Sequence, residues 1–242
     1  MTPSQSPTNS PSKADVAISI PAYLVLIFDN DPAKEYSLIT KEYARSSAHD
    51  VYTKMFVGGE LKNPKGDSIA VDGHVYYGSL HAGSANTWNF NAGSTHLATL
   101  SPENYPIDFG YYEWLALNIQ QGTSYANGRK VFVVDMPRAS GCYDMYDFLD
   151  GDAQGYDLGK TLIVFTYSDT LCLTETHDGR QWGPSVLAPF ATVRLTEAGF
   201  SDGTIIAKRF STVGGLGGSN WNSKGGELQL HGKMYDGPLD CV

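Results

Sequence analysis

Five aspartates between residues 144 and 157 are the first side chains in the sequence whose types and spacing could do chemistry. They are Asp144, Asp147, Asp150, Asp152 and Asp157. Calcium binds clusters of carboxylate oxygens, so Asp147, Asp150 and Asp152 are candidate calcium ligands. The ligand order of an EF-hand loop is absent, however. We therefore favour a solvated acidic loop over a metal site.

Other reactive side chains show none of the spacings that catalysis requires. The G-x-S-x-G pattern of a serine nucleophile is absent, and no two of the six histidines form H-E-x-x-H. Gly214–Ser219 is rich in glycine but lacks the Gly-Lys-Ser/Thr ending of a phosphate-binding loop. Glu175 and Asp178 lie in a polar, turn-like stretch that fits a solvated loop better than a catalytic pair. The sequence therefore predicts no enzyme activity and no cofactor.

Cysteine usage leaves two interpretations open. Cys142 and Cys172 flank a loop-like region and could form a disulfide in an oxidising compartment. Cys241 would then be left over, one residue from the end of the sequence. The alternative is three unpaired thiols. No C-x-x-C spacing indicates a zinc site.

Length and composition favour a β-rich protein. The 242 residues include 26 glycines and 15 tyrosines, and only 18% are charged, whereas 41% are hydrophobic and can form a core. The formal net charge of −9 repels phosphate backbones, so we expect no nucleic-acid partner. No apolar stretch is long enough to cross a membrane.

The first 15 residues differ from the rest in composition. They consist mainly of Pro, Ser, Thr and Asn and cannot bury enough surface to offset the entropy of ordering. We expect a disordered tail over residues 1–15 and a single domain over residues 16–242. No signal peptide is visible, which fits either a cytosolic protein or one whose leader has been removed. The low charge and the Ser/Thr-rich tail favour the second, an extracellular protein.

Short strand-like runs separated by Gly, Asn and Asp predict an all-β fold. They begin with a pair of strands over residues 16–28 and recur at 55–57, 69–71, 74–77, 131–134, 161–167, 186–187, 193–195, 204–206 and 227–230. Residues 41–45 read as a helical turn or a surface loop.

One segment, residues 107–121, predicts a helix. Ser101-Pro102-Glu103 is a plausible helix start and Asp108 is a second candidate N-cap. Tyr111, Trp114, Leu115 and Asn118 share one face. We expect this aromatic face, with Trp114 and Leu115, to dock against a sheet.

An internal repeat near 20 residues predicts how the strands stack. Segment 183–193 echoes segment 203–213. Val186, Leu187 and Ala188 match Ile205, Ile206 and Ala207 at an offset of 19, and Phe190, Thr192 and Val193 match Phe210, Thr212 and Val213 at an offset of 20. Segment 56–61 echoes segment 75–80 more weakly. Such a period is about one coil of a β-solenoid. We expect a right-handed β-solenoid (β-helix) with one α-helix packed alongside and Val186 stacked on Ile205.

The same residues carry a family resemblance. Segment 184–193 and segment 203–208 resemble two consecutive rungs, G-S-V-I-A-P-x-A-x-V and G-x-V-I-A-K, of the choice-of-anchor A domain. Phe56-Val57-Gly58-Gly59 resembles an earlier rung of that family, and Tyr23–Phe28 resembles its opening strand. At the level of the fold, the chain is also similar to the ice-binding solenoids.

The resemblance implies a secreted, non-enzymatic structural or adhesive module of a cell surface or wall, without defined catalytic residues. Its partner would be a cell-surface or matrix component, or further copies of the chain. Exposed aromatic side chains are candidate ligand contacts, with core positions as the alternative: Trp88, Trp182 and Trp221.

Two other functions stay open. An ice- or crystal-surface-binding protein needs a flat array of small residues, and Ser94, Thr95, Thr192 and Thr212 supply a partial ladder. Nearby cations would disturb that plane: Arg194, Lys208 and Arg209. A polysaccharide-active enzyme is the lesser alternative.

Overall fold

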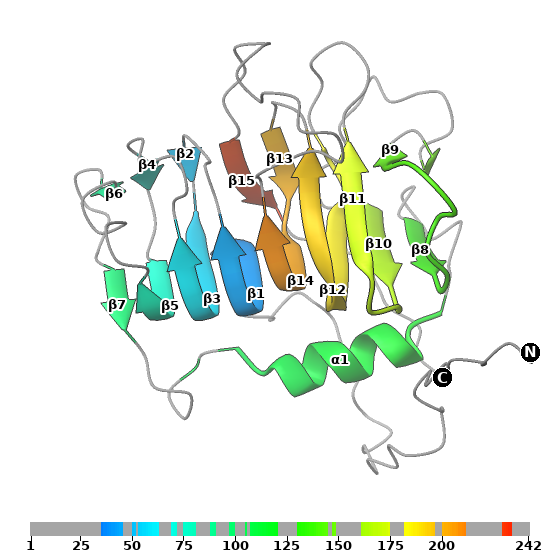
Figure 1. Ribbon diagram of the computed structural model, residues 1–242, viewed down its shortest axis with the longest axis horizontal. Coiled ribbons are helices and arrows are strands. Elements are labelled where there is room, and N and C mark those ends of the chain that lie inside the picture. Colours follow the sequence, from blue (N-terminus) through cyan, green and yellow to red (C-terminus); the bar gives the residue numbers. More distant parts are fainter. Residues whose placement is uncertain are drawn as a thin grey trace, which may run out of the picture.

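The described residues form two parallel β-sheets and one α-helix, so the predicted all-β class is confirmed (Figure 1). The computed structural model describes residues 35–45, 50–51, 53–62, 69–71, 75–80, 88–90, 97–99, 105, 107–120, 130–144, 147–148, 161–174, 182–196, 200–211 and 229–233. The predicted tail and the predicted strands over residues 16–28 lie outside these ranges.

The larger sheet is parallel throughout. Its strands lie in the order β7 (Leu97–Thr99), β5 (Val75–Leu80), β3 (Lys54–Lys62), β1 (Tyr36–Arg45), β14 (Ile205–Ser211), β12 (Ser185–Thr196), β10 (Thr161–Phe165) and β8 (Lys130–Val134). Two further strands continue it beside the second half of β12: β11 (Thr170–Thr174) and β9 (Tyr143–Asp144).

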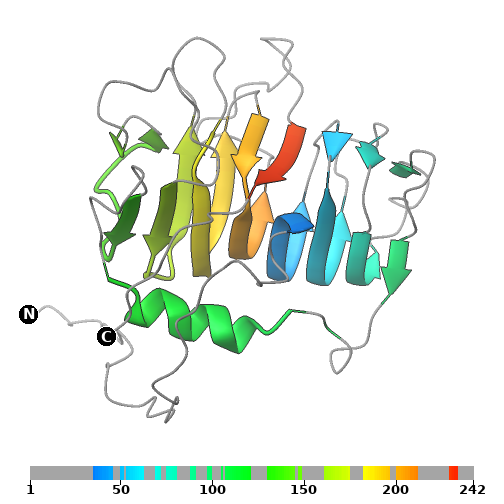
Figure 2. The ribbon, with the colours of Figure 1, turned by 180° about the vertical axis from the view of Figure 1, so that it is seen from behind.

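The smaller sheet is parallel as well. Its strands lie in the order β13 (Phe200–Gly203), β15 (Gln229–Lys233), β2 (Asp50–Val51), β4 (Ile69–Val71) and β6 (Trp88–Phe90). It lies across the molecule from α1, with the larger sheet between them (Figures 1 and 2).

The first strands of the larger sheet run from its middle to one end, and the later strands run from the opposite end back to the middle. From β1 it proceeds through β3 and β5 to β7 at one end. Helix α1 (Phe109–Asn118) then runs back along the sheet, and β8 begins at the opposite end (Figure 1). The chain returns through β10 and β12 to β14, which pairs with β1. An early and a late strand therefore meet in the middle of the sheet.

Most long strands of this sheet bend once, where the register of pairing shifts. The shift falls between Thr40 and Tyr43 in β1 and between Ala188 and Thr192 in β12. Pro189 lies within the second interval, and because proline has no amide hydrogen to donate, such an interruption suits it. At the bend the backbones approach closely. A Cβ on Gly59 would lie 1.7 Å from the Glu42 carbonyl oxygen, so only glycine fits there.

Before the bend, both faces of the larger sheet are buried. Alternate side chains such as Leu38 and Val186 belong to one apolar cluster between the sheets, whereas Ile39 and Leu187 belong to a second cluster that includes α1. Burial on two faces explains the continuous apolar runs in these strands, because no position is left for an alternating polar residue.

Helix α1 is shorter than predicted and presents a different face. Of the two candidate starts, the structure has the second, since the Asp108 carboxylate accepts hydrogen bonds from the backbone amides of Gly110 and Tyr111 at 2.9 and 3.3 Å. The other candidate, residues 101–103, lies outside the described residues. Leu115 is buried as expected. The other buried helix residues are Phe109, Tyr112 and Ala116. Trp114 is only partly buried beside the cluster.

The predicted pairing of the two repeats is confirmed in its first half. Val186 pairs with Ile205, and Ala188 pairs with Ala207. The second half of the alignment was wrong, because Val193 pairs with Phe210 and not with Val213. In β12 the three residues 189–191 stand opposite one residue of β14, and a sequence alignment without gaps cannot represent that bulge.

A similar slip affects the weaker echo. Phe56 pairs with Tyr76 and not with Val75, although Glu60 pairs with Ser79 as aligned. The slip follows from the bend, where β3 carries one residue more than β5. A one-residue error matters because it assigns each side chain to the opposite face of the sheet.

Residues 41–45, interpreted as a turn or loop, instead belong to β1 in the centre of the sheet. Ala44 is fully buried between the polar side chains of Tyr43 and Arg45. This is the alternation of a strand with one solvated face.

Candidate binding surface

Beyond the bend, the core-facing side chains of the larger sheet are buried, whereas the opposite side is exposed or partly exposed over β5, β3, β1 and β12 and at Arg209, but buried at Ser211 and Cys172. Ala44, Leu61, Val193 and Phe210 are fully buried in the core between the sheets. Because side chains alternate along a strand, the residues on either side of them face outward. We call the outward side chains of β5, β3, β1, β14, β12 and β11 beyond the bend the outer face.

The register of pairing arranges the outer face into two rows that cross the strands. The first row is Ser79, Glu60, Tyr43, Arg209, Thr192 and Thr170. The second row is Lys62, Arg45, Ser211, Arg194 and Cys172. Neighbouring members of a row lie on strands about 4.8 Å apart. The first row consists of polar groups, whereas the second includes the buried Ser211 and ends at the buried, disulfide-bonded Cys172.

The outer face carries one cation on each of four adjacent strands. They are Lys62 on β3, Arg45 on β1, Arg209 on β14 and Arg194 on β12. Arg45 is exposed and the other three are partly exposed. The whole chain has 26 acidic residues against 17 lysines and arginines, so this concentration of cations runs against its overall charge.

Glu42 lies at the bend and binds two cations of β14. Its carboxylate contacts Lys208 Nζ at 3.3 Å and the Arg209 guanidinium at 2.5 Å. Burial alone would raise the pKa of Glu42. The hydrogen bonds and charges of Arg209 and Lys208 outweigh burial and hold that pKa below its ordinary value. Arg209 also lies over the Tyr43 ring, 5.7 Å from its centroid.

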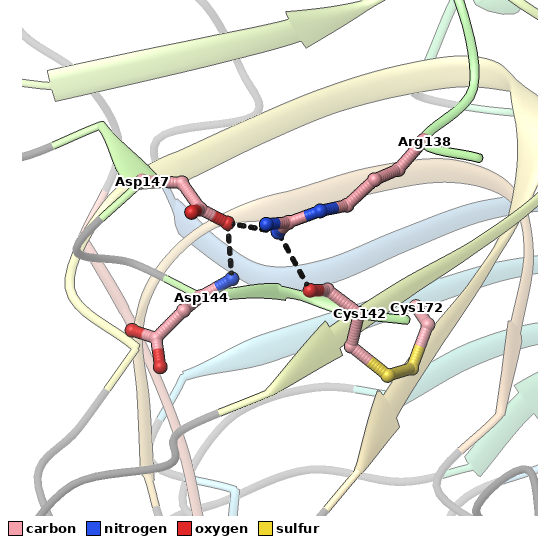
Figure 3. The surroundings of a disulfide bond; sticks show 5 residues. All are labelled: Arg138, Cys142, Asp144, Asp147 and Cys172. Atoms are coloured by element: carbon pink, nitrogen blue, oxygen red, sulfur yellow. Dashed lines mark hydrogen bonds and ion pairs between the residues drawn. A yellow bond between two sulfur atoms is a disulfide. The ribbon is translucent and has the colours of Figure 1, made fainter. Parts of the chain in front are cut away.

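A disulfide closes one end of the second row. Cys142 and Cys172 are bonded, with their Cα atoms 4.6 Å apart (Figure 3). Cys172 pairs in register with Arg194, so the disulfide comes directly after the last cation of the row. It ties the segment after β8 to β11 and thereby to the edge of the outer face.

The segment next to the disulfide, residues 135–141, is exposed along its whole length. Arg138 anchors it. The guanidinium donates to the Cys142 carbonyl oxygen at 2.9 Å and forms an ion pair with Asp147, whose carboxylate also accepts from the Asp144 amide (Figure 3). The side chain of Met136 in this segment is 73% exposed. The structure thus fixes a solvated loop by a covalent bond and a charged hydrogen-bonding centre.

Of the three calcium candidates, only Asp147 lies within the described residues. Among the described residues, no group of three or more histidine, cysteine, aspartate or glutamate side chains could hold a metal ion. Asp147, a calcium candidate, binds Arg138. Asp150 and Asp152 lie outside the described residues.

The three candidate aromatic contacts fare differently. Trp182 is fully buried in the core between the sheets, so its assignment to a binding surface was wrong. Burial of its large apolar ring contributes to the stability of the fold, which explains why the ring lies in the core. The side chain of Trp88 and all of Trp221 lie outside what the structure describes.

The predicted threonine ladder is not continuous over the described strands. Thr192 has Thr170 on one side but Arg209 on the other. Ser94, Thr95 and Thr212 lie outside the described residues. The structure therefore places a cation beside Thr192, where a flat uncharged plane would need a small residue.

Two cations of the outer face, Arg45 and Lys62, were missed by sequence reasoning. In both triplets, Tyr43-Ala44-Arg45 and Glu60-Leu61-Lys62, a small or apolar residue stands between two polar ones. That alternation was a usable signal for a half-solvated strand. It was overlooked because each triplet is short and comes just after the bend.

Comparison with known proteins adds no assignment. The chain matches no protein-family model, no curated protein and no solved structure. Of the helices that the structure describes, none has the length and apolar character to cross a membrane.

Proposed function

We propose that this protein is a non-enzymatic structural or adhesive module of a cell surface or wall, built as a right-handed β-solenoid with one helix alongside. One observation carries the fold part of the proposal. The strand order β12-β14-β1-β3-β5 in the larger sheet is matched by β13-β15-β2-β4-β6 in the smaller one. Each of these five strands of the larger sheet is thus followed along the chain by its counterpart in the smaller sheet, as successive coils of a solenoid require.

Physical rules for connections support the right-handed sense. Parallel strands of one sheet joined by a crossover follow a right-handed path in nearly all proteins. In this chain the crossovers between parallel neighbours of the larger sheet run through strands of the smaller sheet, for example from β1 through β2 to β3.

The disulfide supports an extracellular location. Such bonds persist in oxidising compartments and are rare in the reducing cytosol. Cys142 and Cys172 fix a loop that is fully solvated, which is a reason to keep the bond where reductants are scarce. The resemblance to the choice-of-anchor A domain points to the same location.

Labelling of intact native cells tests this proposal. An impermeant amine-reactive reagent should label the protein on whole cells as fully as after lysis. A cytosolic reporter in the same cells, protected until lysis, is the control. A protein that resists labelling until lysis and fractionates with the cytosol would overturn the proposal.

Ice binding has less support than adhesion. The outer face is regular, but charged side chains interrupt its threonines, and Arg209 adjoins Thr192. A thermal-hysteresis measurement on purified protein distinguishes the two functions, since the adhesive module should show no activity at high protein concentration.

A further inference from the structure

We propose that the disulfide between Cys142 and Cys172 is a redox-controlled latch. It holds an end cap over the aromatic part of the core at the β8 end of the larger sheet, and its reduction releases that cap. The end cap consists of residues 135–144 together with Asp147 and Phe148. The inference goes beyond the proposed surface function and does not depend on it. Its basis is the way in which the end cap is attached to the rest of the fold.

The end cap covers aromatic side chains of two strands. Phe148 is only 9% exposed, and its ring centroid lies 5.6 Å from that of Phe132 in β8 and 6.3 Å from that of Phe165 in β10. Tyr143 also packs against Phe165, with the ring centroids 5.3 Å apart. Phe165 is fully buried in the core between the sheets. The end cap therefore shields the core where the strand order of the larger sheet ends at β8 (Figure 1).

A short strand pairing and the disulfide attach the end cap to the larger sheet. Strand β9 is two residues long, and its register with β11 pairs Tyr143 with Leu173 and Asp144 with Thr174. On its other side, β11 pairs with β12 along all of its five residues. The disulfide occupies the next position of the short pairing, because each cysteine directly precedes a paired residue. A covalent bond therefore extends a pairing that has few backbone hydrogen bonds of its own.

The hydrogen bonds around Arg138 join parts of the end cap to one another (Figure 3). The Arg138 guanidinium donates to the Cys142 carbonyl oxygen at 2.9 Å and forms an ion pair with the Asp147 carboxylate. That carboxylate also accepts from the Asp144 backbone amide at 2.9 Å. These contacts preserve the shape of the end cap without fastening it to the sheet. The cap can therefore move as one unit once its covalent tie is cut.

The two cysteines differ in their access to solvent. Cys142 is partly exposed and follows residues 135–141, which are exposed along their whole length, whereas Cys172 is only 5% exposed. Because thiol–disulfide exchange requires direct attack on a sulfur atom, a reductant should attack the sulfur of Cys142.

A dithiol reductant supplies the two electrons of this reaction. One of its thiolates attacks the Cys142 sulfur and forms a mixed disulfide, while the Cys172 sulfur leaves and takes up a proton. The second thiol of the reductant then loses its proton and displaces Cys142, whose sulfur takes up a proton in turn. The products are the reductant in its disulfide form and two cysteine thiols.

Reduction has different consequences for the two sides of the bond. Cys172 can stay in β11 as a thiol, because free cysteine is among the most often buried residue types. Cys142 loses its covalent tie, and the end cap is then free to open locally while the longer strand pairings of the sheet remain. Opening removes Phe148 from Phe132 and Phe165, so reduction exposes an apolar surface that the oxidised protein keeps covered.

Hydrogen–deuterium exchange of the full chain with and without dithiothreitol tests the inference. The parent chain carries Cys241→Ser, so that Cys142 and Cys172 are its only cysteines. Reduction should accelerate exchange about tenfold in peptides from residues 135–148 and change it less than about twofold in peptides from β1 and β14. The fluorescence of the dye anilinonaphthalene sulfonate, which reports exposed apolar surface, should rise on reduction. It should return to its starting value after reoxidation with oxidised glutathione.

Two variants separate the latch from the cover that it holds. Cys142→Ser/Cys172→Ser should exchange like the reduced parent and should not respond to dithiothreitol. Phe148→Ala keeps the disulfide but removes the covering ring, so dye binding should already rise in the oxidised state. Met136→Ala is the matched control, because it changes a side chain of the same end cap that is 73% exposed, and it should behave like the parent.

Three outcomes would overturn the inference. Unchanged exchange in residues 135–148 after reduction would show that the end cap stays closed without the bond. An equal acceleration in β1 and β14, or loss of the β-sheet circular dichroism spectrum, would show that the disulfide supports the whole fold and does not act as a local latch. Dye binding that persists after reoxidation would show that opening is not reversible.

Discussion

Thr204 donates a hydrogen bond from its side-chain hydroxyl to the backbone carbonyl oxygen of Tyr36, over 2.7 Å and across 168 positions of the chain. The bond is buried and joins the start of β14 to the start of β1. These two strands are where the early and late halves of the chain meet. A single polar side chain therefore helps to hold the two halves in register.

Replacing this threonine should weaken the junction. Thr204→Val keeps the shape of the side chain but leaves the Tyr36 carbonyl oxygen without this donor. We expect a loss of about 1–2 kcal/mol in the free energy of unfolding. Urea denaturation followed by circular dichroism measures it.

The same substitution at Thr40 should have the opposite effect on stability. Its hydroxyl is fully buried and has no hydrogen-bond partner among the described residues. Thr40→Val removes the cost of burying that group, so we expect a gain of up to about 1 kcal/mol. Equal destabilisation by Thr40→Val and Thr204→Val would contradict the assigned roles of both hydroxyls.

The disulfide should contribute strongly to stability. Its cysteines are 30 positions apart, and the entropy lost by the unfolded chain on closing such a loop corresponds to about 3–4 kcal/mol. The double variant Cys142→Ser/Cys172→Ser should lose much of that in urea denaturation. Limited proteolysis should then cut within residues 135–141 faster than in the wild type. Cys241→Ser, which changes a cysteine outside this bond, is the control, and an equal loss there would refute the prediction.

Close packing at the bend predicts a sensitive glycine. In Gly59→Ala the new Cβ would meet the Glu42 carbonyl oxygen, so the backbones of β1 and β3 must separate. We expect a loss of about 1–3 kcal/mol. Ser79→Ala, on the exposed first row, should change stability by less than about 0.5 kcal/mol. Thermal melts of both variants test the contrast, and similar melting curves would show that the bend tolerates a side chain.

Glu42 predicts a pH dependence with a definite sign. Because Arg209 and Lys208 lower its pKa in the folded state, the unfolded state takes up the proton first as the pH falls. The stabilisation that Glu42 gives by pairing with Arg209 and Lys208 is therefore present at neutral pH. It is lost as the pH falls through the pKa of Glu42 in the folded state. Since all three side chains are more than one-third exposed, we expect less than about 1 kcal/mol.

Glu42→Gln should flatten the fall of stability with acidification, and high salt should reduce the difference from the wild type. Denaturation at pH 7 and at pH 3, each with and without 1 M salt, measures both effects. An unchanged pH dependence in Glu42→Gln would remove Glu42 from the explanation.

The sequence predicted the parts of the fold that depend on local pattern. The stacking of Val186 on Ile205 followed from a repeat of apolar residues, and capping preference narrowed the helix start to two candidates, of which Asp108 is the N-cap in the structure. The central strand β1 was not recognised. Its position between β3 and β14 depends on residues far away in the chain, and no local signal encodes such a neighbour.

The outer face was predictable only in fragments. Arg194 and Arg209 were noticed as cations near the threonines, but their adjacency to Arg45 and Lys62 required the register across four strands. That register includes bulges at the bends, whose lengths differ from strand to strand. The candidate surface could therefore not be assembled before the pairing was known.

The meeting of β1 and β14 also constrains how the chain acquires its structure during synthesis. A ribosome delivers β1 early, yet its partner β14 is among the last described strands to emerge. One edge of β1 therefore stays unpaired until β14 is synthesised, and unpaired strand edges can pair with other chains and aggregate. Because contacts between distant segments form slowly, the nascent protein should benefit from a holding chaperone or from crossing a membrane before it folds.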